Sequence, residues 1–343
     1  MANERVLIQG IGGIGGVIAS KMIESGQSPV LVTHNLKITE TIRAKGLRTK
    51  TLDGETQVTA EVYTLLDEVP KDVPFDASYL IMKANSVVDS AILTMPLLKP
   101  DGYLVTFQNG IVEDAVSEVA GRGRVIGGII GWGGTMHEPG VYEKTSIGST
   151  LIGELDGSAT ERVQGLKQSI ECAAPVVISD NIRGALWSKL ALNCTVTTIG
   201  ALTGGTLGEM LQNKAIRQLF LRGYSEVVDT AEALGIRLEP IAADPKLLYL
   251  SRNAGAFARF KKDLIMRILG RKYKNSRGSM LQSLERGRPT EIDFLNGYVV
   301  EQANKAGVPV PINETLVRLI KEIEAGKRSM GQQNVDDLIK AAA

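Results

Sequence analysis

The stretch that decides the fold lies at the start of the chain and reads Arg5-Val6-Leu7-Ile8-Gln9-Gly10-Ile11-Gly12-Gly13-Ile14-Gly15. A short apolar run, typical of a buried strand, leads into the pattern G-x-G-x-x-G, and a helical stretch follows up to Ser25. In this context Gly10 permits a tight turn, Gly12 lets the backbone approach a pyrophosphate, and Gly15 lets the helix pack closely on the strand. The helix N-terminus favours the negative charge of such a ligand. The alternative is a purely structural turn, and we predict a dinucleotide-binding turn made of Gly10, Ile11, Gly12, Gly13, Ile14 and Gly15.

The end of the second predicted strand bears on which dinucleotide is bound. The run Val30–Thr33 is followed by His34 and Asn35, so no acidic residue stands where NAD-binding sites usually carry Asp or Glu. An acidic side chain there would repel a 2′-phosphate, and its absence favours NADP over NAD as the cofactor. His34, with Asn35 and Lys37 beside it, is the candidate ligand for that phosphate. The alternative is that His34 is an exposed loop residue.

The chain changes character near residue 180. Before this point β-branched runs alternate with helical segments, which predicts a parallel sheet with crossover helices. In this part we expect Val141–Ser146 and Thr150–Glu154 to form a hairpin, and Pro175–Ser179 to join the same late sheet. After Asp180 the pattern is helical. The predicted fold class is an α/β Rossmann-type NAD(P)-binding domain over residues 1–179, followed by a mostly α-helical substrate and catalytic domain over residues 180–343.

Composition and charge exclude several classes of protein. The 343 residues are 43% hydrophobic and 22% charged, a globular balance that suits two domains of about 150 residues each. The net charge of +1 gives no field to recruit nucleic acid or an anionic membrane, and no apolar run reaches the length of about 20 residues that a membrane span needs. The two cysteines are too few for a disulfide framework, and their spacing is not that of a zinc site. Together with the lack of a secretory signal, this predicts a cytoplasmic protein without a metal.

One long predicted helix carries polar residues in an otherwise apolar run. Lys189, Asn193 and Thr197 are spaced four residues apart and therefore share one face of this helix. In an apolar stretch such side chains must be paired, exposed at an end, or directed into a polar cleft. A lysine in a cleft can act as a general acid. The alternative is a surface lysine whose aliphatic part lies along the helix while its amine reaches water.

A series of motifs resembles the ketopantoate reductase family over nearly the whole chain. They are Lys83 after Ile81-Met82, Gln108-Asn109-Gly110, Asn181-Ile182-Arg183, Leu186-Trp187-Ser188-Lys189-Leu190 with Asn193, Ser279-Met280-Leu281-Gln282, Thr290-Glu291-Ile292-Asp293-Phe294-Leu295-Asn296-Gly297, and Gly307-Val308-Pro309-Val310-Pro311-Ile312-Asn313. The resemblance implies an NAD(P)H-dependent oxidoreductase of the 2-dehydropantoate 2-reductase type. Its reaction would be the NADPH-dependent reduction of a 2-oxo acid to the 2-hydroxy acid, with 2-dehydropantoate, an intermediate of pantothenate biosynthesis, or a related compound as the substrate.

The resemblance also implies roles for residues at matching positions. Lys189 would protonate the substrate oxygen as hydride reaches the carbonyl carbon, and Glu291 would orient the substrate. Ser279 would bind the substrate carboxylate, and Asn193 would hold the hydroxyl region with Thr197 beside it. Without the resemblance, Glu291 would be a helix N-terminal acid favoured by the helix dipole, and Ser279 a helix cap. On the cofactor side the residues implied are Lys83 and Asn109, next to the nicotinamide and its ribose.

Three positions depart from what is common in the family. Thr197 and Leu207 stand where the family often carries asparagines that contact substrate, and His34 stands in place of a cofactor-phosphate arginine. A more apolar pocket would suit a substrate other than ketopantoate. Two alternatives stay open, namely another β-hydroxyacid-type NAD(P) dehydrogenase and a non-catalytic NADP-binding sensor.

The expected partner is a small-molecule 2-oxo acid, and a homodimer is an open possibility. Residues 259–277 carry eight basic side chains and one acidic side chain, a pattern that usually marks a solvated helix face. Such a stretch could also attract an anionic ligand. Aromatic residues for stacking are sparse there, so nucleic-acid binding is not expected.

Overall fold

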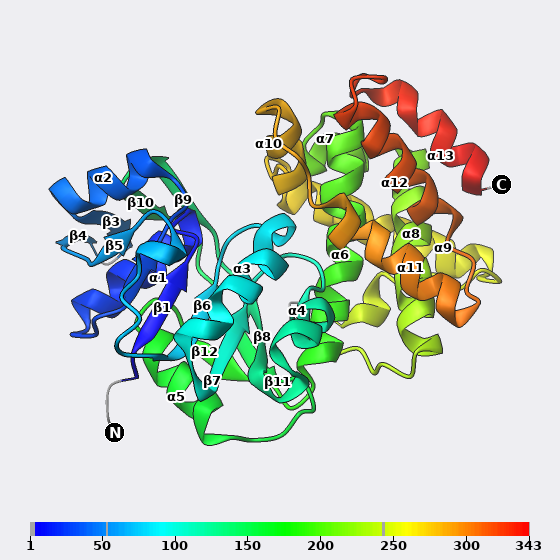
Figure 1. Cartoon of the computed structure of the whole chain (residues 1–343). Coiled ribbons are helices and arrows are strands. Elements are labelled where there is room, and N and C mark those ends of the chain that lie inside the picture. The colour runs from blue at the N-terminus through cyan, green and yellow to red at the C-terminus, as the bar shows by residue number, and fades with distance from the viewer. Residues whose placement is uncertain (1–3, 53, 242–243, 343) are drawn as a thin grey trace. The chain divides into compact units, whose positions relative to one another are not determined.

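The computed structural model describes residues 4–52, 54–241 and 244–342, and the chain divides into two compact units (Figure 1). The first unit comprises Met1–Gln108 and Val112–Ile182, and the second comprises Asn109–Ile111 and Arg183–Ala343. The short segment Asn109–Ile111 thus groups with the second unit, although the residues on either side of it belong to the first. Within the described residues, the structure contains no helix with the length and apolar character needed to cross a bilayer.

The first unit is built on an eight-stranded sheet with the strand order β12-β11-β8-β7-β6-β1-β2-β5. Its strands are β1 (Val6–Gln9), β2 (Val30–Val32), β5 (Val62–Tyr63), β6 (Phe75–Leu80), β7 (Leu98–Thr106), β8 (Val125–Ile130), β11 (Thr150–Glu154) and β12 (Val176–Ile178). Neighbouring strands are parallel except for β8 and β11. β2 and β6 flank β1, so the strand order reverses at β1, where open α/β sheets bind ligands beyond the carboxyl ends of their strands. This confirms the predicted Rossmann-type domain.

A second, four-stranded sheet packs on the first helix of this unit. Its strands are β3 (Leu47–Thr51), β4 (Gly54–Val58), β9 (Gly134–Glu138) and β10 (Val141–Lys144), in the order β4-β3-β10-β9. Helix α1 (Gly13–Glu24) contacts all four, and its residues from Gly15 to Ser20 are buried. A helix that is apolar on nearly all sides needs such cover, which explains why the small sheet lies there.

The hairpin expected from Val141–Ser146 and Thr150–Glu154 is wrong. β10 pairs with β9 in the small sheet, whereas β11 pairs with β8 in the large one. The two connecting segments run side by side between the sheets, because Thr145 N donates to the Gly133 carbonyl (2.8 Å) and Gly131 N donates to the Ser149 carbonyl (2.9 Å). The expectation that Pro175–Ser179 joins the sheet of Thr150–Glu154 is confirmed, because β12 pairs with β11.

Helices follow the strands of the large sheet and leave little of it exposed. They are α2 (Leu36–Lys45), α3 (Val87–Thr94), α4 (Glu113–Ala120) and α5 (Glu161–Ile170). α1 contacts α5, and α3 contacts α4. Every residue of β1 and β2 is buried, as in parallel sheets covered on both faces.

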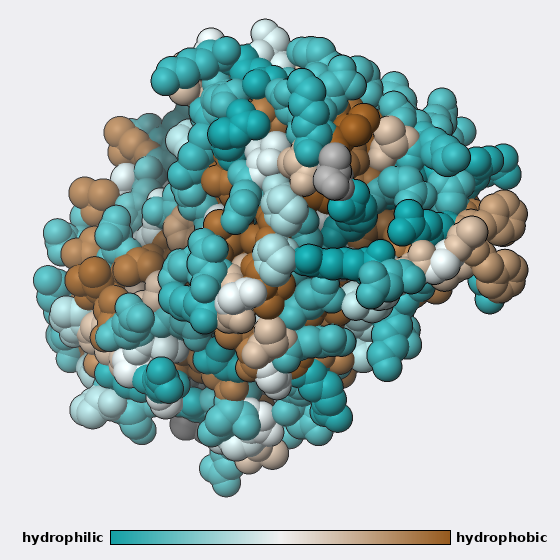
Figure 2. Space-filling view, turned by 90° about the vertical axis from the view of Figure 1, so that its right-hand side faces the viewer, coloured by the Kyte–Doolittle hydropathy of each residue, from teal (hydrophilic) through white to brown (hydrophobic). Residues whose placement is uncertain are grey.

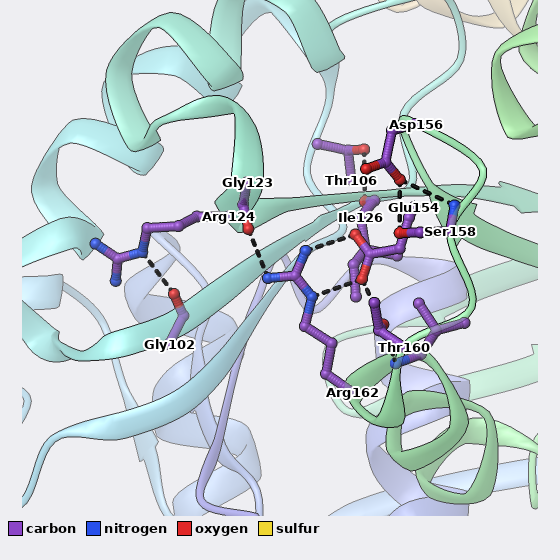
Figure 3. Close-up of polar contacts among 11 residues, drawn as sticks. Gly102, Thr106, Gly123, Arg124, Ile126, Glu154, Asp156, Ser158, Thr160 and Arg162 are labelled. Atoms are coloured by element: carbon purple, nitrogen blue, oxygen red, sulfur yellow. Dashed lines mark hydrogen bonds and ion pairs between the residues drawn. The ribbon is translucent and has the colours of Figure 1, made fainter.

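An ion pair between the buried Glu154 and the partly exposed Arg162 joins β11 to α5 (Figure 3). The Glu154 carboxylate accepts bonds from Arg162 (Nε–Oε1 2.6 Å) and from the hydroxyl of Thr160, the N-cap of α5 (2.6 Å). Arg162 also donates to the Gly123 carbonyl at 2.7 Å. A buried carboxylate is costly without such partners, so this cluster fixes the position of α5 on the sheet.

The second unit is helical, and its long helix α6 (Ile182–Thr203) has 22 residues. The others are α7 (Leu207–Gln212), α8 (Lys214–Ala233), α9 (Ala256–Lys272), α10 (Ser279–Glu285), α11 (Asn296–Ala306), α12 (Pro311–Glu324) and α13 (Val335–Ala342). Trp187 of α6 packs against Tyr298 of α11, with ring centroids 5.8 Å apart. Gly223 lets α8 pack closely on α12, because an added β-carbon would lie only 3.1 Å from Cγ2 of Ile312.

A fully buried chain of hydrogen bonds connects α6, α11, α12 and α8. Asn296 of α11 donates to the Cys194 carbonyl of α6 (3.0 Å) and accepts from the Thr198 hydroxyl (2.7 Å). Asn296 also donates to Asn313 Oδ1 (2.9 Å), and Asn313 Nδ2 donates to the carboxylate of Glu226 in α8 (2.7 Å). Each amide is fixed by its partners, so α6 is held in one position relative to α11.

Candidate active site

The glycine turn has the shape that a dinucleotide requires. Gly10 has φ +92°, and a β-carbon there would lie 2.5 Å from the backbone nitrogen of Met82. A β-carbon on Gly15 would lie 2.1 Å from the Gly10 carbonyl oxygen, so strand and helix can pack only around glycine. A β-carbon on Gly12 would meet no atom within 4 Å, which leaves open space at the N-cap of α1. The turn therefore fits a pyrophosphate.

The small sheet supports this turn, which the sequence did not reveal. Gly13 packs on Gly134 of β9, since an added β-carbon would lie 2.2 Å from the Gly134 carbonyl oxygen. The buried Tyr142 of β10 donates its hydroxyl to the Ile11 carbonyl (3.3 Å), and Gly16 leaves room for its ring. Gly134 and Tyr142 are thus structural supports of the glycine turn. Their only sequence signal is a glycine and an aromatic residue in short strands.

His34 is exposed at the end of β2 with a left-handed backbone of φ +53°. Its backbone N–H donates to the Thr64 carbonyl (3.1 Å), which fixes the loop. Asn35 is the N-cap of α2, and its Oδ1 accepts from Ile38 N (3.2 Å). The His34 imidazole and the first turn of α2 are therefore accessible to a ligand. The side-chain oxygen of Asn35 is already used, because it caps the helix.

Gln108 connects the ends of β6 and β7. Its Nε2 donates to the carbonyls of Leu80 (2.8 Å) and Met82 (3.0 Å). Lys83 follows directly, is exposed, and precedes a single turn of 3₁₀ helix over Ala84–Ser86. Buried Gln108 thus shapes the loop that carries Lys83, a positioning role that its place in the Gln108-Asn109-Gly110 motif did not show.

In the second unit, the face of α6 predicted to be polar forms a partly exposed stripe along the helix. This stripe consists of Lys189, Asn193 and Thr197, together with Leu192 and Val196. The Asn193 Nδ2 atom is buried and has no hydrogen-bond partner among the described residues. The Thr197 hydroxyl donates to the Asn193 carbonyl (2.8 Å), so it keeps only its acceptor function for a ligand.

Ser279 belongs to the same region as Thr197. It is the first residue of α10, it is exposed, and its predecessor Gly278 packs directly on Thr197. Leu207, at the start of α7, donates its backbone N–H to the Ser276 carbonyl (2.9 Å). Two of the three positions that depart from the family pattern, Thr197 and Leu207, therefore flank one segment, residues 276–279.

Glu291 and Asn109 lie on two segments that meet. Glu291 is partly buried and precedes the 3₁₀ turn Ile292–Phe294. Ile111 N donates to the Phe294 carbonyl (3.4 Å), and a β-carbon on Gly110 would lie 2.3 Å from that carbonyl oxygen. Asn109, expected on the cofactor side, is thus held against the segment that carries Glu291.

The fold and these two sets of residues define a class of protein, the two-domain oxidoreductases that use a nicotinamide nucleotide. Comparison with known proteins gives the family. The chain belongs to the ketopantoate reductase family, because the model "Ketopantoate reductase PanE/ApbA" matches residues 6–157 and "Ketopantoate reductase PanE/ApbA C terminal" matches residues 181–324.

Curated relatives and solved structures agree with this assignment. The chain is 27% identical to a 2-dehydropantoate 2-reductase of Mesorhizobium japonicum, over 93% of this chain and 97% of that protein. It is 29% identical to one of Pyrococcus horikoshii, over 94% and 98%. A PanE/ApbA family ketopantoate reductase from Ralstonia eutropha superposes with a TM-score of 0.80 at 25% identity, over 95% and 100%. D-mandelate dehydrogenase, solved with NADH and anilino(oxo)acetate, shares the fold with a TM-score of 0.79 at 20% identity, over 94% and 99%.

Proposed function

We propose that this protein reduces a 2-oxo acid to the 2-hydroxy acid with NADPH, and that its substrate is 2-dehydropantoate or a 2-oxo acid with a more apolar tail. The single observation that carries this proposal is the polar stripe of α6 next to the segment that carries Ser279. The stripe includes Lys189 and the Asn193 Nδ2 atom, which has no hydrogen-bond partner within the part of the chain that the structure describes. Family membership and the names of the curated relatives support the reaction type.

The cofactor would be held by the first unit. The open N-cap of α1 at Gly12 fits the pyrophosphate, and exposed His34 is the candidate partner of a 2′-phosphate. When bound, the reduced nicotinamide supplies the hydride. The preference for NADP rests on the absence of an acidic side chain directly after β2.

The residues of the second unit would act on the substrate. Lys189 Nζ would carry the proton that the carbonyl oxygen takes up, and a nearby ammonium stabilises the negative charge that develops there. The Asn193 amide would donate to the same oxygen or the adjacent hydroxyl, which would satisfy a buried N–H group. Ser279, at the N-terminus of α10, would bind the carboxylate, and Glu291 would accept a hydrogen bond from the substrate.

The tail of the substrate would lie near Leu207 and Thr197. Leu207 offers no hydrogen bond, and Thr197 has given its donor to the Asn193 carbonyl. A substrate hydroxyl could donate to the Thr197 oxygen, but one directed at Leu207 would be left unpaired at a cost of about 1–3 kcal/mol. This favours an apolar tail over the hydroxylated tail of 2-dehydropantoate.

A substrate panel tests the proposal. The purified protein is mixed with NADPH or NADH and a set of 2-oxo acids that includes 2-dehydropantoate, aliphatic 2-oxo acids and aryl 2-oxo acids, and oxidation of the cofactor is followed by absorbance. Turnover of at least one 2-oxo acid, with the highest kcat/KM for an apolar tail, would support it. If kcat/KM is highest for 2-dehydropantoate, the proposed reaction type stands and the proposed preference for an apolar tail is wrong. Oxidation of 3-hydroxy acids by NADP⁺ or NAD⁺, without reduction of any 2-oxo acid, would favour a β-hydroxyacid dehydrogenase, and cofactor binding without turnover would favour a sensor.

A further inference from the structure

Helix α9 exposes a row of large apolar side chains, which we call the α9 stripe. It consists of Phe257, Phe260, Leu264 and Ile268, whose exposed fractions are 73%, 66%, 49% and 56%. The spacing of three and four residues places them on one face of the helix. This face differs from the one that packs on the protein, which buries Asp263, Met266 and Gly270.

We propose that the α9 stripe is the surface through which two copies of this chain associate. On the face drawn in Figure 2, apolar side chains reach the surface in separate groups within a mostly hydrophilic surrounding. Single exposed apolar residues are normal, whereas a continuous apolar row of this size often marks an interaction site. An identical row on a second copy, related by a two-fold axis, is complementary to it by symmetry.

The exposed area matches what a homodimer needs. If each fully exposed side chain of this size offers about 200 Å², the stripe presents about 500 Å² of apolar surface. A standard interface buries about 800 Å² per partner, of which about 65% is apolar in homodimers. The stripe alone therefore supplies the apolar part of one half of such an interface.

The basic residues of α9 are arranged around the stripe. Arg267 is paired with Asp263 (2.9 Å), and Lys261 Nζ lies 5.2 Å from the ring centroid of Phe257. The helix still carries six basic residues and one acidic residue, so two copies would repel each other weakly through solvent. Salt screens this repulsion, which predicts that self-association strengthens with ionic strength. Binding to an anionic partner would weaken with salt. The direction of the salt effect therefore distinguishes a second copy of the chain from an anionic partner.

The test is sedimentation equilibrium of the full chain from about 1 to about 100 µM, at low and high salt. We expect a dimer of the 36.8 kDa chain whose dissociation constant stays equal or falls as salt increases. The double variant Leu264→Ser/Ile268→Ser should raise the dissociation constant by about 100-fold or more. A matched control is Leu93→Ser/Ile92→Ser on α3, where the same residue types are 54% and 50% exposed, and this variant should associate like the native chain.

Three results would overturn the proposal. A chain that stays monomeric over the whole concentration range has no such interface. A dimer of unchanged affinity in the Leu264→Ser/Ile268→Ser variant, with circular dichroism as in the native chain, uses another surface. A monomer that binds vesicles of phosphatidylserine and phosphatidylcholine, with an affinity that falls with salt, uses the stripe for an anionic surface instead.

Discussion

Gly278 lies directly against Thr197, because a β-carbon added to Gly278 would be 2.9 Å from the Cα atom of Thr197. Gly278 is the N-cap of α10, and Ser279 is the first residue of that helix. The missing side chain at position 278 therefore lets Ser279 lie beside the α6 face that carries Asn193 and Lys189. This contact joins two motifs that are far apart in the sequence.

Gly278→Ala should push the start of α10 away from α6. Because the clash is with backbone, the segment must move, and we expect KM for the 2-oxo acid to rise about tenfold or more, with little change in cofactor affinity. Gly255→Ala is a matched control, since Gly255 is the N-cap of α9 with a similar backbone and an added β-carbon meets no atom within 4 Å. Steady-state kinetics of both variants decide the matter. Equal KM values would show that α10 does not help to bind substrate.

Asn193→Leu should separate stability from function. The Asn193 Nδ2 atom is buried without a partner among the described residues, and such a group costs about 1–3 kcal/mol. Removing it should leave the melting temperature unchanged or raise it, whereas kcat/KM should fall about 10- to 100-fold because a donor to the substrate is lost. Thermal melts and kinetics on the same preparation provide the comparison. A loss of stability with unchanged kcat/KM would make Asn193 structural.

The cofactor preference should depend on the charge at position 34. We predict that NADPH binds the native protein about tenfold more tightly than NADH, and that His34→Asp reverses this order by repelling the 2′-phosphate and accepting from the ribose hydroxyl. Asp tolerates the left-handed backbone of φ +53° found at His34. His34→Asn tolerates it as well and stays neutral, so it should not favour NADH. Calorimetric titration measures all three proteins, and equal affinities of the native protein for both cofactors would refute the preference.

The pH dependence of stability should carry a contribution from Glu226. Burial raises the pKa of this carboxyl from 4.5 to about 7, although Ile312 N, Asn313 N and Asn313 Nδ2 all donate to it. Between these two values the folded state binds a proton that the unfolded state has lost, so this group makes the fold less stable as the pH rises through the window, by up to about 1.4 kcal/mol per pH unit.

Comparison with Glu226→Gln isolates this contribution, because glutamine does not titrate. The native protein should lose stability relative to the variant as the pH rises from about 5 to about 7, and the difference should level off above that range. Thermal melts over this range measure it. A constant difference across the window would mean that Glu226 is charged in the folded protein at low pH.

Much of the fold could be predicted because its signals are local. The run before Gly10 and the glycine pattern specify a strand, a turn and a helix within one short stretch, and the switch to helical periodicity after residue 180 marks the second unit. The small sheet could not be predicted in this way. β3 pairs with β10, which lies far away in the sequence. β10 pairs with β9 rather than with β11, and this choice depends on contacts between the two connecting segments, which no single stretch of sequence reveals.

For the candidate site, local signals give the residues of one helix face but not the contacts between distant segments. Spacing placed Lys189, Asn193 and Thr197 on one helix face, and the structure shows that this face is partly exposed. The contacts that bring Gly278 to Thr197 and Gly110 to Phe294 depend on close backbone approaches between distant segments. Glycine in the sequence permits such an approach but does not identify the residue on the other side.

Lys189→Ala provides the most direct test of the central claim, which is that Lys189 is the proton donor in the reduction of a 2-oxo acid. With the best substrate of the panel, we predict that kcat falls about 10²- to 10⁴-fold while the affinity for NADPH is unchanged. The control is Lys305→Ala, an exposed lysine paired with Glu301 on α11, which should keep native kcat. A Lys189→Ala variant that retains near-native kcat would contradict the account and would make Lys189 a structural residue.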